Sequence, residues 1–146
     1  MFQNILVPVD GSQGSLKAVR TAAEIARRFE SEVTLVHVME PLTSMVAAAG
    51  MAGMAATDAS ANEALGRAAD EILRSAGQSL GLPEERVKRE VLLGHPAEMI
   101  CRAAEEAGHD LIVMGSRGLS EVRAFFLGSV SDRVIHHAPC PVLIVR

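Results

Sequence analysis

The sequence contains no tryptophan and no tyrosine, and its aromatic residues are four phenylalanines. This scarcity argues against a binding module that stacks nucleic-acid bases on aromatic side chains. The formal net charge of −4 argues in addition against a protein that binds nucleic-acid phosphates through a basic surface. We therefore expect no nucleic-acid partner.

Long apolar segments and cysteine pairs are scarce as well. No apolar run reaches the roughly 20 residues that a membrane-spanning helix needs, and the N-terminal stretch lacks the basic region and cleavage site of a signal peptide. Two cysteines, Cys101 and Cys140, do not make a disulfide framework. We expect a cytoplasmic protein with no membrane partner, folded as one domain over residues 1–146.

Almost continuous apolar runs at residues 5–9, 33–38, 111–114 and 142–145 predict strands covered on both faces, as in parallel sheets. A fifth strand is predicted at 87–93, where central charged residues suit the edge of a sheet. Helical periodicity and helix-end signals predict helices over 16–29, 65–80, 96–108 and 129–137. This alternation predicts an α/β fold, an open, doubly wound, Rossmann-like parallel sheet of five strands with helices on both faces.

Residues 42–62 do not follow this alternation. The segment is rich in alanine, methionine, glycine, serine and threonine. It suits a surface loop, a lid, or an extension of the helix that follows, and the surface loop is the interpretation we favour.

The segment after the fourth predicted strand carries the strongest functional signal. In open α/β sheets, ligands bind beyond the carboxyl ends of the strands. Gly115 and Gly118 follow this strand, and Gly128 and Ser129 open the last predicted helix. Exposed backbone N–H groups, the helix N-terminus and the nearby Arg117 could together hold a polyphosphate. The alternative is that these glycines serve only turns and a helix cap.

Asp10 closes the first predicted strand, where its carboxylate could accept hydrogen bonds from ribose hydroxyls or an adenine amino group. The alternative is that Asp10 or Ser12 caps the first helix, and both interpretations hold if Ser12 caps while Asp10 faces the cleft. Val38 and Met114 could present apolar faces to a planar base. Ordinary core packing is the competing interpretation for these two side chains.

Several catalytic motifs are missing from the sequence. It has no Gly-x4-Gly-Lys-Ser/Thr loop, no Gly-x-Ser-x-Gly elbow, and no Ser-Gly-Gly-x-Asp-Ser signature of ATP pyrophosphatases. His136 and His137 fall at a helix end, where positive charge is welcome, so we do not interpret them as metal ligands. We therefore assign no catalytic residue and no metal-binding side chain, although phosphate clamping alone could support slow hydrolysis.

The chain resembles the universal stress protein family along essentially its whole length. The matching stretches are residues 5–12 (ILVPVDGS), 37–38 (HV), 94–96 (GHP), 110–118 (DLIVMGSRG), 128–131 (GSVS) and 140–145 (CPVLIV). The Gly-x2-Gly-x9-Gly-Ser pattern marks the ATP-binding branch of that family. The resemblance therefore implies a nucleotide-binding protein with the strand order 3-2-1-4-5.

The resemblance also implies which residues bind ATP. Asp10 would contact the ribose or adenine, and Val38 would pack on the adenine. The other implied site residues line the pocket (Pro8, Val9), frame the ribose and inner phosphates (Met114, Gly115, Arg117, Gly118) or bind the outer phosphates (Gly128, Ser129, Val130, Ser131). Mg²⁺ or Mn²⁺ would bridge the phosphates. Arg117 stands where the family often has histidine, which should help phosphate binding.

The last predicted strand, Val142–Val145, is wholly apolar although the implied strand order places it at an edge. Because an exposed apolar edge is a template for pairing, we expect a homodimer through this strand. The function we expect is nucleotide-dependent regulation in a stress response, exerted through an unknown protein partner. The alternatives are a slow ATPase or phosphotransferase that uses the same pocket, and a structural or chaperone-like dimer without nucleotide.

Overall fold

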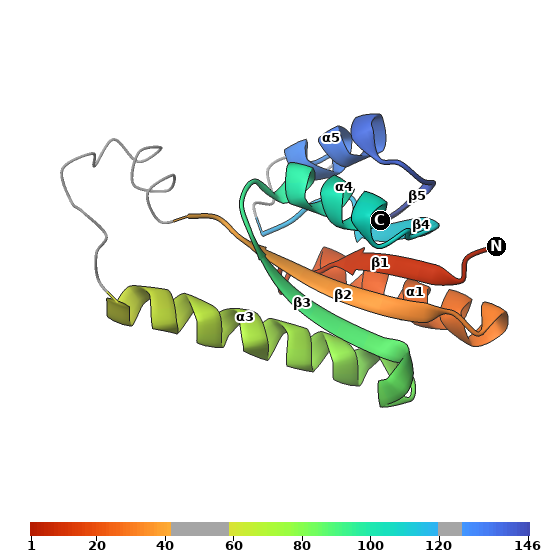
Figure 1. Ribbon diagram of the computed structural model, residues 1–146, viewed down its shortest axis with the longest axis horizontal. Coiled ribbons are helices and arrows are strands. Elements are labelled where there is room, and N and C mark those ends of the chain that lie inside the picture. The colour runs from red at the N-terminus through yellow and green to blue at the C-terminus, as the bar shows by residue number, and fades with distance from the viewer. Residues whose placement is uncertain (42–58, 120–126) are drawn as a thin grey trace.

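The computed structural model describes residues 1–41, 59–119 and 127–146. Its strands are β1 (Asn4–Pro8), β2 (Glu32–Met39), β3 (Val87–Leu93), β4 (Leu111–Gly115) and β5 (Val142–Val145). They form one parallel sheet in the order β3-β2-β1-β4-β5 (Figure 1). The predicted α/β class, the strand order and the edge position of the charged strand β3 are all confirmed.

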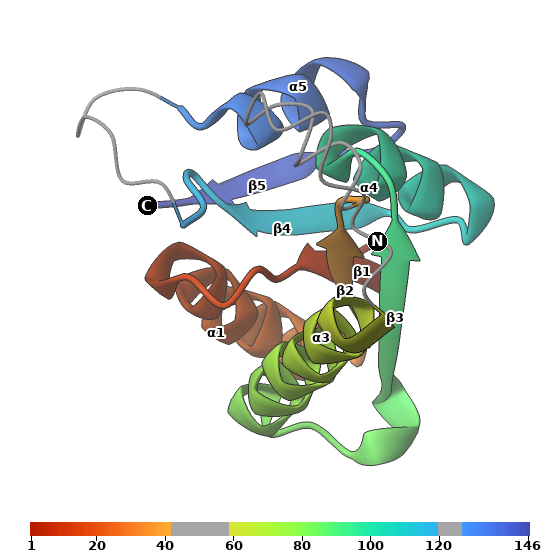
Figure 2. The ribbon, with the colours of Figure 1, turned by 90° about the vertical axis from the view of Figure 1, so that its left-hand side faces the viewer.

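In the part of the chain that the structure describes, four α-helices cover the sheet. Helices α1 (Gln13–Phe29) and α3 (Ala59–Leu80) lie on one face, and α4 (Pro96–Glu106) and α5 (Ser129–His137) lie on the other (Figure 2). A short 3-10 helix, Glu84–Arg86, leads into β3. Among the described residues, no helix combines the length and apolar character needed to cross a membrane.

The core has two layers because successive strand residues point to opposite faces of the sheet. In β4, Leu111 and Val113 pack with α1 and α3, whereas Ile112 and Met114 pack with α4 and α5. All four side chains are buried. This burial on both faces explains why the central strands consist of continuous apolar runs.

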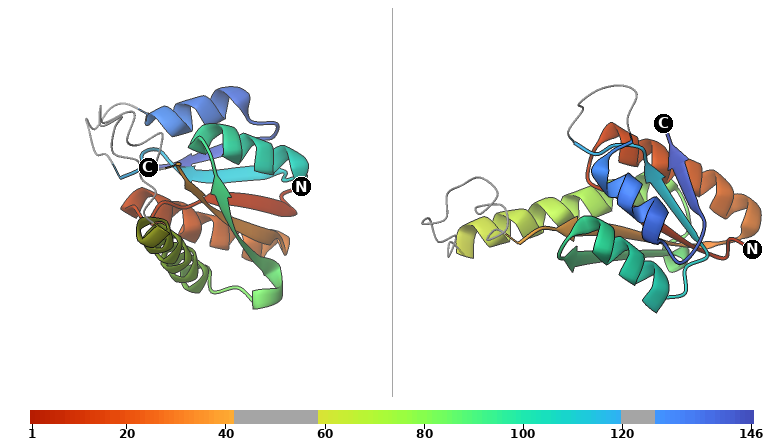
Figure 3. Two further views of the ribbon diagram at one scale, coloured as in Figure 1. Left: turned by 60° about the vertical axis from the view of Figure 1, so that its left-hand side comes forward. Right: turned by 90° about the horizontal axis from the view of Figure 1, so that it is seen from above.

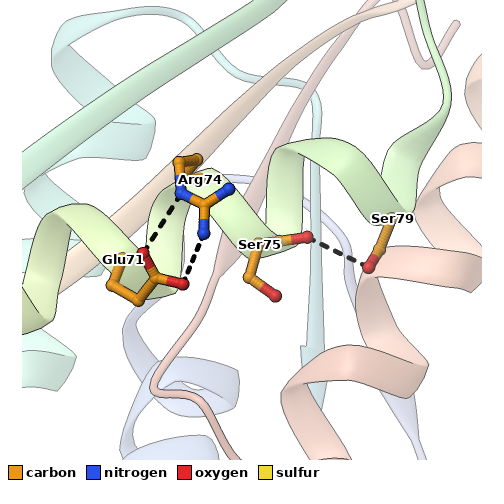
Figure 4. A network of polar contacts seen from close by, with 4 residues as sticks. All are labelled: Glu71, Arg74, Ser75 and Ser79. Carbon is orange, nitrogen blue, oxygen red and sulfur yellow. Dashed lines mark hydrogen bonds and ion pairs between the residues drawn. The ribbon is translucent and has the colours of Figure 1, made fainter.

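Helix α3 starts earlier than the periodicity predicts, at Ala59 rather than Leu65. Residues 59–62 therefore belong to the helix and not to a loop, as expected of an alanine-rich stretch with high helix propensity. The rest of the uncertain segment, residues 42–58, lies outside the described residues. The exposed face of α3 is polar, with an ion pair of 2.6 Å from Arg74 to Glu71 and a hydrogen bond from the Ser79 hydroxyl to the Ser75 carbonyl (Figure 4).

A serine cap and two arginine side chains stabilise the ends of α1 and the end of α3. The Ser12 hydroxyl oxygen accepts a hydrogen bond from the Ser15 N–H at 3.1 Å, so Ser12, one of the two candidates from the sequence, caps α1. At the other end of α1, Arg86 donates to the carbonyls of Ala26 and Ser31 at 2.6 to 3.0 Å. Arg27 in turn donates to the Leu80 carbonyl at the end of α3.

The strand arrows all point to one end of the sheet (Figure 3), so the segments after them meet at a common edge.

Candidate functional site

A cavity of about 690 Å³ opens at the carboxyl edge of the sheet, between the segments that follow β1, β2 and β4 and the start of α5. The structure brings all twelve predicted site residues to its walls: Pro8, Val9, Asp10, Val38, Met114, Gly115, Arg117, Gly118, Gly128, Ser129, Val130 and Ser131. These residues come from four separate stretches of the chain. Their convergence follows from the parallel sheet, which places the ends of β1, β2 and β4 side by side.

The two carboxylate oxygens of Asp10 lie against different parts of the chain. Its Oδ1 accepts the Ser12 N–H at 2.9 Å, which fixes the turn that leads into α1. Its Oδ2 lies so close to Gly118 that a Cβ atom at position 118 would come within 2.6 Å of it. The side chain of Asp10 therefore bridges the β1 turn and the loop after β4, on the wall of the cavity, while Ser12 caps the helix.

Gly115 is explained by packing inside the protein. A Cβ atom at this position would lie 2.8 Å from the carbonyl carbon of Gly14, in the first turn of α1. A Cβ atom at Gly14 would conversely lie 2.9 Å from the Arg117 carbonyl oxygen. The two glycines let α1 and the end of β4 approach closely, so a side chain at Gly115 would displace backbone rather than only narrow the cavity.

The start of α5 lines the cavity with backbone N–H groups that have no acceptor within the helix. The Gly128 N–H donates to the Ser116 carbonyl at 2.8 Å, which fixes the beginning of the helix. The buried Ser131 hydroxyl lies 2.9 Å from the carbonyls of both Ser116 and Gly128 and is a donor to the backbone. Gly128 caps α5 without a side-chain hydrogen bond, so the first N–H groups of the helix have no intrahelical acceptor. This geometry favours an anion there, and Ser129 is exposed beside it.

The other half of the cavity is apolar. Met114 is 5% exposed and packs in the core layer under α4 and α5, so it is both core and cavity wall. Val38 is half-buried and packs against the same layer. The two competing interpretations of these side chains are thus compatible, because the core reaches the floor of the cavity.

Sequence reasoning did not assign six further lining residues: Val36, His37, Glu40, Pro96, Ile100 and Leu119. Two of them, His37 and Glu40, lie at the carboxyl end of β2, the strand predicted over residues 33–38. His37 Nδ1 is 2.8 Å from the Val9 carbonyl oxygen. Since a carbonyl only accepts, this nitrogen carries the proton and Nε2 of the neutral ring is an acceptor. Ile100 enters from α4, which no local sequence signal indicates.

Side chains that could ligate a metal line the cavity as Asp10, His37 and Glu40, but the described residues do not form a metal-binding cluster there. In residues 1–41, 59–119 and 127–146, no cluster of three or more histidine, cysteine, aspartate or glutamate side chains suits a metal ion. Burial raises the pKa of both the Cys101 and Cys140 thiols, which disfavours the reactive thiolate. The arrangement therefore offers directed hydrogen bonds, an apolar slot and a helix N-terminus.

The whole chain matches the sequence model of a known protein family. The model of the universal stress protein family matches residues 1–146. The chain belongs to the universal stress protein family. A curated member of the family, "Universal stress protein in QAH/OAS sulfhydrylase 3'region" of Thermus aquaticus, is 38% identical over 147 residues, and all of both chains is covered.

Solved structures of family members share the fold and include nucleotide complexes. One is a universal stress protein in complex with cAMP, with a TM-score of 0.71, 26% identity, and coverage of 99% of this chain and 97% of that chain. Another is the universal stress protein from Archaeoglobus fulgidus in complex with dAMP, with a TM-score of 0.65, 26% identity and full coverage of both chains. The family thus includes proteins that bind adenine nucleotides.

Proposed function

We propose that this member of the universal stress protein family binds an adenine nucleotide, ATP in particular, in the cavity at the carboxyl edge of the sheet. The observation that carries the proposal is the convergence of the twelve residues predicted from sequence on one cavity. The cAMP and dAMP complexes of related proteins support the same ligand class.

The geometry suggests a position for each part of the ligand. The adenine lies in the apolar half, against Val38 and Met114. The ribose hydroxyls donate to Asp10 Oδ2, the carboxylate oxygen that the Ser12 N–H does not occupy. The phosphates reach the N–H groups at the start of α5, with the exposed Ser129 beside them. A Mg²⁺ or Mn²⁺ ion would be held chiefly by the phosphates.

We infer a regulatory role rather than a dedicated enzymatic one. His37 is held by the Val9 carbonyl and not by a second polar side chain, so the described lining residues contain no side-chain dyad of the kind that activates water in hydrolases. Nucleotide binding would instead change the surface that a partner protein meets. A slow ATPase activity remains the alternative for the same pocket, and measured turnover that Asp10→Asn abolishes would favour it.

The test compares the wild type with Asp10→Asn in a calorimetric titration with ATP. The amide oxygen of the variant can still accept the Ser12 N–H, so the fold is kept while the anionic acceptor is lost. We expect the affinity for ATP to fall about tenfold to a hundredfold with little change in thermal stability. Asp70→Asn on α3 is the control and should bind as the wild type does. An affinity of Asp10→Asn for ATP equal to that of the wild type would overturn the assignment of the nucleotide site to this cavity.

The oligomeric state is a second part of the proposal. Strand β5 is an edge strand, and its Leu143 side chain is 37% exposed. An apolar edge of this kind favours pairing with β5 of a second copy about a two-fold axis. We propose a homodimer formed through Val142–Val145.

A further inference from the structure

A second, larger hollow runs between α4 and α5, next to the candidate nucleotide cavity. It measures about 960 Å³, and we call it the α4–α5 groove. Its lining residues are Glu40, His95, Pro96, Ala97, Glu98, Cys101, Arg102, Glu105, Ser129, Val130, Arg133, His137 and Pro139. Of these lining residues, the proposed function uses only Ser129 and Val130.

The groove combines an apolar floor with charged rims. Ala97, Cys101 and Val130 are half-buried and pack against the core layer below, so they form apolar surface at its base. Glu98 and Glu105 stand exposed on α4. A floor of this kind suits the apolar side of a peptide segment better than a small, fully hydrated ion.

The balance of charge in the groove favours a cationic occupant. Three carboxylates (Glu40, Glu98 and Glu105), two guanidinium groups and two imidazole rings line it, which leaves one formal negative charge when the imidazoles are neutral. One guanidinium, that of Arg102, is already bound to the Glu106 carboxylate at 2.7 Å, and this bond raises the pKa of Arg102. Arg133 stands on the opposite wall. Among the ion pairs of the described residues, none involves Glu40 or Glu105.

The spacing of the acidic residues suggests the form of the occupant. Glu98 and Glu105 lie about 10 Å apart along α4, at a rise of about 1.5 Å per residue. Basic side chains at positions i and i+7 of a helical segment have the same spacing. Two turns of an amphipathic helix could thus place lysine or arginine against both glutamates, with apolar residues on the floor.

We infer that the α4–α5 groove is a docking site for a lysine- or arginine-bearing amphipathic segment of a partner protein. The groove shares Glu40, Pro96, Ser129 and Val130 with the candidate nucleotide cavity. The outer phosphates of a bound nucleotide at Ser129 would add negative charge at the end of the groove. Nucleotide binding therefore strengthens docking, and this coupling, unlike the docking itself, rests on the proposed function.

The test uses the full chain and a fluorescein-labelled helical peptide of about twelve residues, with lysines at i and i+7 and leucines on one side. Anisotropy titrations at near-physiological ionic strength compare the wild type with the double variant Glu98→Gln, Glu105→Gln. We expect the double variant to bind the peptide about tenfold more weakly. The control, Asp70→Asn with Glu85→Gln, makes the same change in net charge away from the groove and should stay within about twofold of the wild type.

Three results would overturn the docking site. They are the absence of binding to the wild type, an equal loss of affinity in the two double variants, and equal binding of a peptide with glutamate in place of lysine. Circular dichroism of each variant confirms that the fold is retained.

The nucleotide arm repeats the titration with AMP and with ATP, while calorimetry measures nucleotide binding on the same samples. We expect ATP to tighten peptide binding several-fold relative to AMP. Bound ATP without any effect on the peptide would overturn the coupling alone. Failure of ATP to bind would overturn the proposed function, whereas the glutamate variants decide the docking site independently.

Discussion

The side chain of Asp110 ties together two parts of the chain that are far apart in sequence. Its two carboxylate oxygens accept the N–H groups of Gln3 and Asn4 at 2.8 and 3.0 Å, and its own N–H donates to the Asn4 carbonyl. Burial raises the pKa of this carboxyl group, but the backbone N–H donors and the N-terminal charge outweigh that effect, so the pKa is lowered. The ionised form is thus the one that the fold stabilises.

Replacing Asp110 by alanine should lower the free energy of unfolding by about 1–3 kcal/mol, because two backbone donors lose their acceptor. The wild type should lose this contribution as the pH falls through the lowered pKa of the folded state. Urea unfolding of both proteins at neutral and acidic pH measures the difference. A difference that does not shrink on acidification would contradict this account of Asp110.

His109 gives the molecule a second pH dependence, with a different origin. The side chain is 9% exposed, and its Nδ1 and Nε2 lie 3.2 Å from the Ala103 carbonyl and 3.0 Å from the Thr34 hydroxyl. Burial lowers the pKa of His109 from its ordinary value of 6.5. At a pH between the lowered pKa of His109 in the folded state and its ordinary pKa in the unfolded state, the unfolded chain binds more protons than the folded one. The free energy of unfolding therefore rises with pH in that window, and the contribution of the neutral His109 side chain is lost as the pH falls below 6.5.

We expect His109→Gln to flatten this part of the stability profile. The glutamine amide does not titrate, so the slope of unfolding free energy against pH should decrease below pH 6.5, although the variant is less stable overall. Chemical denaturation across mildly acidic pH measures the slope. His137→Gln, which removes an exposed histidine, should keep the slope of the wild type, and an equal flattening in both variants would refute the role of His109.

At the scale of elements, the end of α1 depends on a single arginine from the segment before β3. The Ser31 carbonyl is an acceptor of Arg86 through both Nε and a terminal nitrogen, and Ser31 is fully buried. Removal of the guanidinium leaves a buried acceptor unsatisfied. We expect Arg86→Met to lower the unfolding free energy by about 1–3 kcal/mol, measured by urea denaturation. Arg28→Met, at an exposed position of the same helix, should change it far less.

The alternation of apolar runs and helical periodicity was enough to predict the five strands, the four helices of the described residues, and the common edge where Asp10 and Gly115 line one cavity. The contact between Gly14 and Gly115 could not be predicted in the same way, since it depends on how closely α1 approaches β4 in three dimensions. The same holds for Ile100, which joins the cavity only through the packing of α4. The start of α3 was missed because a helix that projects beyond the sheet needs no strict apolar periodicity there.

At the scale of the whole molecule, the two edges of the sheet differ. Strand β3 carries Lys88, Arg89 and Glu90, charges that discourage pairing, whereas β5 carries none between Val142 and Val145. We expect the wild type to sediment as a dimer at micromolar concentration and Leu143→Lys to sediment as a monomer. Val91→Lys, the same kind of change at an exposed position of β3, should leave the dimer intact. A monomeric wild type would refute pairing through β5.

The strand order also determines when each part of the sheet is complete during synthesis. Strand β1 lies in the middle of the sheet, and its neighbour β4 begins next to Asp110, which is 106 positions after Asn4. At about 5–20 residues per second, a ribosome needs on the order of ten seconds to make that interval. During this time the backbone N–H and C=O groups on one side of the apolar strand β1 have no partner strand, and they are open to chaperones and to other nascent chains. Strand β1, at the centre of the finished sheet, thus has the longest interval between its own synthesis and that of its second neighbouring strand.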